Sequence, residues 1–303
     1  MEKSTGQIRK KLLAGFLIVS GLSLGLVLAM HPSSQSCLYK NRGQYRRAID
    51  TNIEGQKNPL FAGDPGIELD IAYCFRQSGD LAEARRHLAL ARELASGHGY
   101  LWLFRPHGLE HSLACEEGWI DMKSKQYEEA LATFDRALAL EKSAEAYSGR
   151  AAVLESLGRD SEALSDYEAA IKCSTGHDRE VAYHERAIFY TNRGKTDEAI
   201  ADLTSALKAD TCNRAFIDRA MLYKKQGYDE KALNDLSSSI SNAGTERAYH
   251  ERALLKRARG DFDGAIKDID AAMSLDSSCA RLEKDRDLIL AESGKAQPQS
   301  QEQ

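Results

Sequence analysis

Residues 183–199 read YHERAIFYTNRGKTDEA, and residues 249–265 read YHERALLKRARGDFDGA. Both segments belong to one pattern that occurs four times between Ala144 and Ser278. Each copy contains a glycine, and these glycines are separated by 36, 33 and 33 residues. They are Gly158, Gly194, Gly227 and Gly260. A fixed period of this size predicts an array of similar supersecondary units, none of which buries its apolar face alone.

Small and aromatic residues recur at fixed distances from each glycine. An aromatic residue stands eleven positions before it, an alanine stands seven before and five after it, and alanine or serine stands twelve after it. Apolar residues at helical spacing on both sides predict two helices with the glycine between them, and the small residues allow these helices to cross closely. In chain order these sets are Tyr147, Tyr183, Phe216 and Tyr249; Ala151, Ala187, Ala220 and Ala253; Ala163, Ala199, Ala232 and Ala265; and Ala170, Ala206, Ser239 and Ala272.

This order and period of residues resembles the tetratricopeptide repeat, an antiparallel helix pair of about 34 residues. The resemblance implies an all-α fold, a right-handed superhelical solenoid of antiparallel helix pairs. It also implies that the first helices of the pairs line a concave groove that holds a peptide or a partner helix. The function is then expected from a surface and not from a catalytic cluster.

Weaker copies extend the array toward the N-terminus, so it is expected to cover residues 37–278. Gly79 marks the second repeat, and Lys125 stands where the glycine of the third would be. Extra residues near 97–110 interrupt the period, as functional loops do. The expected repeats are 37–61, which is degenerate, 65–96, 111–143, 144–177, 180–212, 213–245 and 246–278. A capping helix is expected at 279–293, followed by a disordered tail at 294–303.

The N-terminal part of the chain predicts a membrane segment. Leu12 to Met30 is nineteen residues without a charge, which is long enough to cross a bilayer as a helix. Residues 1–11 are basic, so this tail is expected in the cytoplasm and the repeats on the other side of the membrane, after a linker at 31–36. The protein is therefore expected to be a single-pass membrane protein. The alternative is a secreted or periplasmic protein after cleavage near Ala29.

An arginine eight positions before the glycine is matched by an aspartate eight positions after it in the four regular repeats. In the two repeats before them both members are absent, because Ile71 accompanies His87 and Glu117 accompanies Thr133. Joint presence and joint absence predict a contact, and buried charges persist only when they are paired. The predicted structural ion pairs are Arg150 with Asp166, Arg186 with Asp202, Arg219 with Asp235, and Arg252 with Asp268.

No motif predicts catalysis, a cofactor or a small-molecule substrate. The His-Glu pairs at 184–185 and 250–251 lack the second histidine that a zinc-protease helix carries one turn later, so no metal site is expected. Six cysteines form no CxxC motif. A disulfide between Cys173 and Cys212 is the best candidate pairing for exported repeats, and buried free thiols are the alternative. Neither a phosphate-binding glycine loop nor a nucleophile elbow occurs.

The groove implied by the resemblance is acidic. The glycine of each repeat, or Lys125 in the third, will be called the reference residue. Every repeat from the second onward carries an acid nine positions before it, except the fourth, which has Gly149 there. A solvated helix face is the alternative interpretation, and a basic partner would complement the acids. The predicted partner-binding residues are Asp70, Tyr73, Glu116, Trp119, His184, Glu185, Asp218, His250 and Glu251.

Composition agrees with a protein partner. The formal net charge is −5, which argues against nucleic acid as the main partner. The sequence therefore predicts a non-catalytic protein–protein interaction scaffold, tethered to or exported across a membrane, that binds a peptide or a partner helix. The alternative is an accessory subunit that packs permanently in a membrane or secretion complex.

Overall fold

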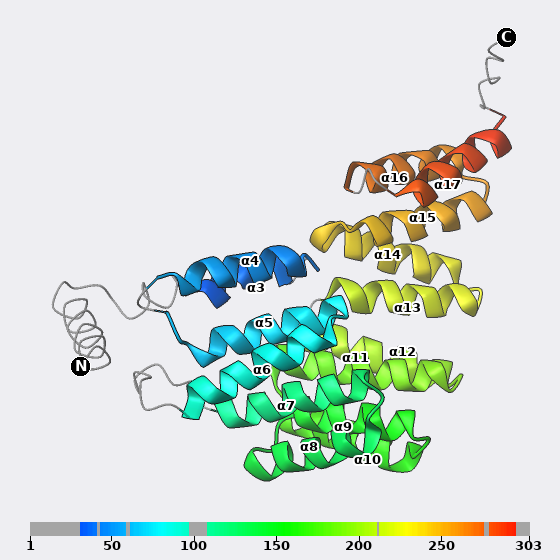
Figure 1. Ribbon diagram of the computed structural model, residues 1–303. Coiled ribbons are helices and arrows are strands. Elements are labelled where there is room, and N and C mark those ends of the chain that lie inside the picture. Colours follow the sequence, from blue (N-terminus) through cyan, green and yellow to red (C-terminus); the bar gives the residue numbers. More distant parts are fainter. Residues whose placement is uncertain are drawn as a thin grey trace, which may run out of the picture. The chain divides into compact units, whose positions relative to one another are not determined.

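The computed structural model describes residues 31–40, 43–58, 61–96, 108–210, 212–275 and 279–294. All regular elements in these ranges are α-helices, so the predicted all-α class is confirmed (Figure 1). The first helices of successive pairs are α3 (Pro32–Lys40), α5 (Pro65–Ser78), α7 (Leu109–Lys123), α9 (Ala144–Ser156), α11 (Gly176–Asn192), α13 (Asn213–Lys225) and α15 (Glu246–Ala258). The second helices are α4 (Tyr45–Gln56), α6 (Leu81–Ser96), α8 (Tyr127–Leu140), α10 (Asp160–Cys173), α12 (Thr196–Ala209), α14 (Asp229–Ala243) and α16 (Phe262–Leu275). Helix α17 (Ala280–Glu292) follows the last pair.

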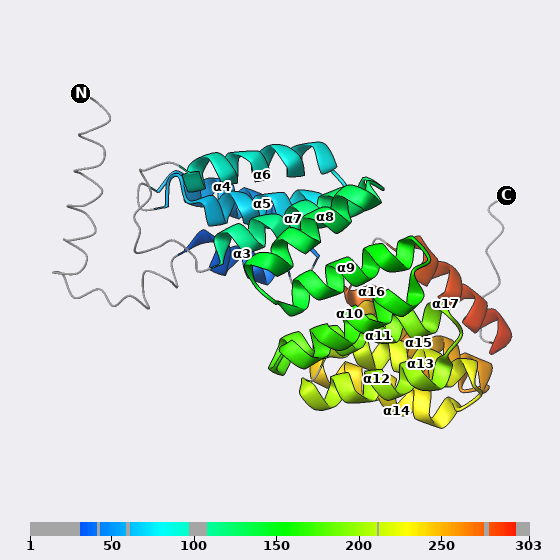
Figure 2. The same ribbon diagram turned by 90° about the horizontal axis from the view of Figure 1, so that it is seen from below.

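The chain divides into two compact units, residues 1–166 and 167–303. Unit 1 contains α3 to α9 and the start of α10, and unit 2 contains the rest of α10 and α11 to α17. Within each unit the two helices of a pair lie side by side, as α5 and α6 do in unit 1 and α15 and α16 in unit 2 (Figures 1 and 2).

The residue between the two helices of a pair has a left-handed backbone in seven repeats. Six of these residues are glycines, with φ between 68° at Gly43 and 90° at Gly79. The turn closes the first helix, since the Lys195 amide donates a hydrogen bond of 2.9 Å to the carbonyl oxygen of Tyr190. Lys125 takes the same conformation with φ 62°, and among the described residues it alone does so without being glycine. A side chain in this conformation costs about 1–2 kcal/mol.

Replacing Lys125 with glycine should therefore stabilise the protein. Lys125→Gly removes the strain without losing a buried side chain, because Lys125 is exposed, and should add about 1 kcal/mol to the free energy of unfolding in urea. The control is Lys267→Gly, which removes an exposed lysine from the interior of α16 and should cost about 1 kcal/mol. Equal destabilisation by both changes would contradict the strain at Lys125.

Small residues fill the crossing of the two helices in every repeat from the second onward. The position five after the reference residue is alanine throughout, and none of these alanines has exposed surface. They are Ala84, Ala130, Ala163, Ala199, Ala232 and Ala265. The positions seven before and twelve after are also buried alanines, except for Gly118 and Ser239. The helix backbones can therefore approach one another closely along each unit.

One aromatic side chain in unit 1 depends on two glycines. Phe134 in α8 has no exposed surface and lies between α7 and α9. A Cβ atom on Gly118 would come within 2.8 Å of its ring, and one on Gly149 within 2.3 Å. Both distances are too short for a side chain, so the ring fits only because both residues are glycine. This packing explains why Gly149 interrupts the acidic row.

In unit 2 the last helix covers the final apolar face. Leu282 and Ile289 of α17 have no exposed surface and pack with Ala265, Ile269 and Ala272 of α16. Helix α17 therefore shields the apolar face of α16 from solvent at the end of the array. Helix α17 lies within residues 279–293, where a capping helix was expected.

Residues 31–36 differ from the expected linker, because α3 begins at Pro32. Proline is tolerated in the first turn of a helix, where its missing N–H would have no partner in any case. Tyr39 of α3 packs against the cluster that contains Phe61 and Ile67, and His31 bonds Asp64 at 2.8 Å. These contacts make α3 part of unit 1.

The expectation of a single-pass membrane protein is corrected. Within the described ranges the structure contains no helix with the length and apolar character that a membrane span needs. The stretch from Leu12 to Met30 that led to the expectation lies outside the described residues, as do the tail at 1–11 and the cleavage site near Ala29. Residues 97–107 of the insertion and 295–303 of the tail also lie outside them.

The predicted disulfide between Cys173 and Cys212 is not formed. Both residues are free thiols in the structure, as are the other cysteines, Cys37, Cys74, Cys115 and Cys279. The Cys173 thiol donates to the carbonyl oxygen of Ala170 at 3.4 Å, within its own helix. Cys212 precedes the first turn of α13 as its N-cap residue.

Candidate protein-binding surface

The first helices of unit 2 and the final helix α17 each carry an apolar residue on a face that the core does not use. These residues stand six positions before the glycine, and they will be called the apolar row: Ile188 in α11, Met221 in α13, Leu254 in α15 and Leu288 in α17. Ile188 is 40% exposed and Leu288 is 44% exposed, and the other two are half-buried. The core clusters among the described residues of unit 2 include neighbours such as Tyr190 and Tyr223 but no member of the row.

Val181 widens the row on α11. It is 39% exposed and lies seven residues, or two helical turns, before Ile188. Residues separated by two turns share a helix face, so Val181 and Ile188 are two exposed apolar side chains on one face of α11. Scattered exposed apolar residues are normal, but a row at one position of consecutive repeats is a mark of a binding surface.

Polar side chains beside the row join consecutive first helices of unit 2. His184 of α11 bonds Asp218 of α13 at 2.8 Å, and His250 of α15 bonds Asp285 of α17 at 2.7 Å. In both contacts the histidine stands ten positions before the glycine of its own repeat, and the aspartate stands nine positions before the next glycine. They will be called the His–Asp joints. His184 and His250 are buried, so these two predicted partner-binding residues hold repeats together instead of facing a partner.

The remaining acids of the predicted groove in unit 2 are also engaged or partly covered. Asp218 accepts a second bond from Arg247 at 3.1 Å, and Glu251 lies 3.7 Å from the ammonium nitrogen of Lys224. Glu185 is half-buried in α11. Cationic side chains therefore partly neutralise the acids of the predicted groove in unit 2.

The environment of Asp218 favours its charged form. Burial works against the carboxylate, but the hydrogen bond from His184 and the nearby charges of Arg247 and Arg214 outweigh it. The pKa of Asp218 consequently lies below its ordinary value. A carboxyl group of this kind contributes stability above its unfolded pKa and loses the contribution as the pH falls through its folded pKa.

Asp218→Asn should therefore destabilise the protein in a pH-dependent way. The free-energy difference from the wild type in urea unfolding should be largest above the unfolded carboxyl pKa of about 3.9 and should shrink as the pH falls below it. Asp287→Asn, at an exposed position of α17, is the control and should have little effect at any pH. A difference that grows toward acid pH would contradict this role of Asp218.

In unit 1 three of the predicted groove residues meet around Arg76, which the sequence analysis did not single out. The Arg76 guanidinium makes two hydrogen bonds to the Glu116 carboxylate, at 2.7 and 3.0 Å, and both side chains are 6% exposed. The same guanidinium lies 5.1 Å from the ring centre of Tyr73 and 5.8 Å from that of Trp119. Burial raises the pKa of Glu116, and the bonds from Arg76 oppose this shift. The cluster joins α5 to α7.

The last predicted groove acid, Asp70, bonds Lys40 of α3 at 2.9 Å. Lys40 also lies 5.8 Å from the ring centre of Tyr73. Tyr73 and Trp119 stand at the position that the apolar row occupies in unit 2, but here both pack against core clusters. Helices α3, α5 and α7 are therefore joined by ion pairs beside aromatic rings, and none of their described residues is an exposed large apolar side chain.

Each of the four predicted arginine–aspartate pairs is in contact. In every pair the arginine Nε and one terminal nitrogen donate to the two carboxylate oxygens at 2.7–2.8 Å. The aspartates are buried and the arginines are partly covered. Each guanidinium also lies 5.9 Å from the ring centre of a tyrosine in its own helix, as Arg186 does with Tyr183. These pairs join the two helices of one repeat.

Removing one partner of such a pair should be costly. Arg186→Ala leaves the Asp202 carboxylate buried without its two charged hydrogen bonds and should lower the free energy of unfolding by about 2–4 kcal/mol. The double change Arg186→Met with Asp202→Leu should restore much of this loss. Arg159→Ala breaks a pair that is open to solvent and should hardly move the urea midpoint. Similar effects of Arg186→Ala and Arg159→Ala would show that the first pair is not structural.

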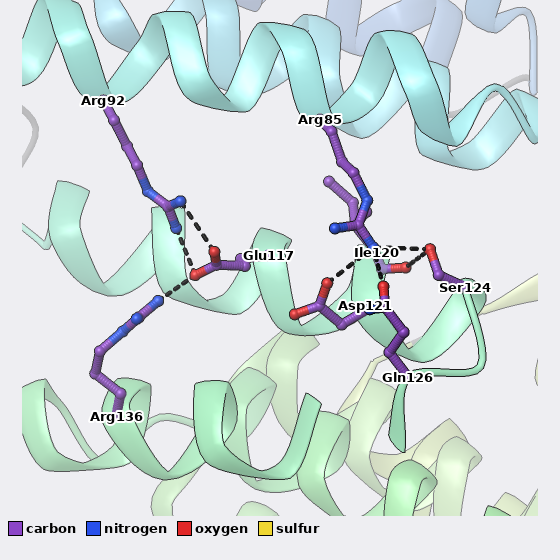
Figure 3. A network of polar contacts seen from close by, with 8 residues as sticks. All are labelled: Arg85, Arg92, Glu117, Ile120, Asp121, Ser124, Gln126 and Arg136. Carbon is purple, nitrogen blue, oxygen red and sulfur yellow. Dashed lines mark hydrogen bonds and ion pairs between the residues drawn. The ribbon is translucent and has the colours of Figure 1, made fainter. Parts of the chain in front are cut away.

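The third repeat uses the opposite charge at the arginine position. Glu117 of α7 lies between Arg92 of α6 and Arg136 of α8 and bonds both, with two hydrogen bonds from Arg92 at 2.9 and 2.5 Å (Figure 3). These bonds outweigh the effect of burial, so the pKa of Glu117 is lowered. Nearby, Arg85 of α6 bonds Asp121 at 3.0 Å. Helix α6 is thus joined to α7 of the next repeat by ion pairs in which the second helix carries the arginine and the first helix carries the acid.

The second repeat replaces the arginine–aspartate pair in a different way. His87 stands at the aspartate position and bonds Glu68 at 2.6 Å, and its ring stacks on Phe75 with 5.3 Å between ring centres. Glu68 is buried and occupies the place of the usual aromatic residue. The sequence indicates this contact, because a histidine stands at the aspartate position and an acid stands at the aromatic position of the same repeat.

A family match covers the central part of the chain. Residues 115–178 match the tetratricopeptide repeat family. This segment is therefore similar to tetratricopeptide repeats. The helix pairs before and after it share its left-handed turn residue and its buried alanines. No curated protein sequence matches the chain.

The chain is also similar in fold to solved structures. A chain of the APC/C hetero-tetramer Cut9-Hcn1 has a TM-score of 0.55 and 14% identity, covering 95% of this chain and 54% of its own length. For pilF of Pseudomonas aeruginosa the TM-score is 0.52 and the identity 14%, with 74% of this chain and 96% of that one covered. A tetratricopeptide repeat protein from Parabacteroides merdae has a TM-score of 0.48 and 18% identity, with 86% and 97% covered. The first two likenesses confirm the predicted solenoid fold.

Proposed function

We propose that the protein is a non-catalytic scaffold that binds an apolar segment of a partner protein along the first helices of unit 2. The observation that carries this proposal is the apolar row, with Ile188 and Leu288 each about two-fifths exposed. Burial of such side chains supplies about 25 cal/mol per Å² of apolar surface, and a row of four at the repeat spacing suits an extended peptide or an amphipathic helix.

Two further points support a protein partner. The tetratricopeptide repeats are a fold that acts through extended surfaces. The structurally similar Cut9-Hcn1 is itself a hetero-tetramer. A basic partner, which the sequence analysis offered as a complement to the acids, is less favoured, because Asp218 and Glu251 already have cationic neighbours in unit 2.

The test uses the purified full-length protein and a peptide display library. Peptides selected on the wild type should be rich in apolar side chains. By isothermal titration, the variant Ile188→Asp with Leu288→Asp should bind these peptides at least about tenfold more weakly, since one lost apolar anchor is worth roughly 1–3 kcal/mol. Both changed residues are exposed, so the fold should tolerate the changes.

The matched control is Leu275→Asp. Leu275 is 55% exposed at the end of α16, a second helix, and so lies off the apolar row. This variant should bind the selected peptides as the wild type does. Equal binding by the row variant and the wild type would contradict the proposal, as would a loss confined to the Leu275 variant.

A further inference from the structure

Three side chains that can bind a metal converge between α7 and α9 in unit 1, away from the apolar row. His111 and Cys115 are four residues apart on α7, a spacing that places both on one face of the helix. Glu145 comes from the first turn of α9. The imidazole nitrogen, the thiol sulfur and a carboxylate oxygen all lie within 4.8 Å of one another.

The hydrogen bonds of His111 leave its Nε2 atom without a proton, so that the lone pair of this nitrogen can bind a metal ion. Its Nδ1 atom lies 3.1 Å from the carbonyl oxygen of Ala137, which can only accept, so Nδ1 carries the proton. The unprotonated Nε2 faces the Cys115 sulfur at 3.4 Å and the Ser143 hydroxyl at 2.8 Å. A histidine that ligates a metal through one nitrogen commonly donates its other N–H to a carbonyl group in this way.

The surroundings of Cys115 favour a cation. Its thiol is fully buried, and the carboxylates of Glu145, Glu116 and Glu141 lie near it. These carboxylates would stabilise a positive charge beside the thiol. A bound divalent ion would supply that charge and release the thiol proton to solvent.

We propose that His111 Nε2, Cys115 Sγ and a Glu145 carboxylate oxygen bind a zinc ion. Zinc prefers thiolate, imidazole and carboxylate ligands in a tetrahedral arrangement. With Zn–S of about 2.3 Å and Zn–N of about 2.0–2.1 Å, two such ligands lie about 3.5 Å apart. The 3.4 Å between His111 Nε2 and Cys115 Sγ already matches this spacing.

Glu145 and a water molecule would supply the other two positions of the tetrahedron. Glu145 is exposed and its carboxylate oxygen lies within 4.8 Å of the other two ligand atoms, so the site opens to solvent there. The Ser143 hydroxyl gives up its bond to His111 and keeps its bond from the Ala146 amide at 3.1 Å, which caps α9. Water supplies the fourth ligand. The ion joins the third repeat to the fourth.

The test is a titration of the chelator-treated, reduced full-length protein with cobalt(II), which reports tetrahedral thiolate sites by its absorption. One cobalt per chain should bind with a sulfur-to-cobalt charge-transfer band and strong visible bands, and zinc should displace it. Cys115→Ser should abolish the charge-transfer band. Glu145→Gln, a change at the surface, should weaken binding by at least about tenfold.

The matched control is Cys74→Ser, because Cys74 is also fully buried and lies on α5. This variant should keep the cobalt spectrum of the wild type. Zinc should also raise the melting temperature of the wild type but not that of Glu145→Gln, which keeps the test decisive if Cys115→Ser folds poorly. An unchanged spectrum in both site variants, or no tetrahedral cobalt spectrum in the wild type, would overturn the proposal.

Discussion

The close crossing of two helices through buried alanine is the constraint on which each repeat depends. The alanine five positions after the turn has no exposed surface in any of six repeats, and a larger side chain there would push the helices apart. Close crossing in turn brings the arginine of the first helix within bonding distance of the aspartate of the second. The ion pairs are therefore a consequence of the packing, and they fix the register of two helices that alanine alone would leave free to slide.

Contacts inside a repeat could be predicted because both partners recur at one spacing. Arg186 and Asp202 stand on either side of Gly194 as their counterparts do elsewhere, so the pattern itself pointed to the pair. The exception at Gly149 could not be explained from the pattern, since it depends on the ring of Phe134 in another helix. The reversed pair of Glu117 was equally hidden, because Arg92 and Arg136 occupy places that are not charged in a repeating way.

Contacts between repeats were largely missed. The sequence placed His184 and Asp218 on one groove as separate binding residues, whereas the structure joins them to each other. Helix α17 was expected only as a cap, but Gly294 after it has φ 69° and sets Asp285 and Leu288 in the register of a first helix. The apolar row was overlooked for a related reason: its members differ in size and shape, from Met221 to Leu254, and attract less notice than a row of acids.

The reversed charge at Glu117 has a consequence for how the repeats assemble. Helix pairs of similar sequence can stack in the wrong order while the chain folds, because each exposes nearly the same apolar face. A first helix that carries the arginine can form its ion pair with any second helix that carries the aspartate. The charges of the later repeats therefore do not distinguish one repeat from another. Helix α7 would set the Glu117 carboxylate against that aspartate, and the two like charges would repel. The Glu117 carboxylate is paired only when α7 packs beside the helices that carry Arg92 and Arg136. This one carboxylate therefore specifies the position of the third repeat in the array.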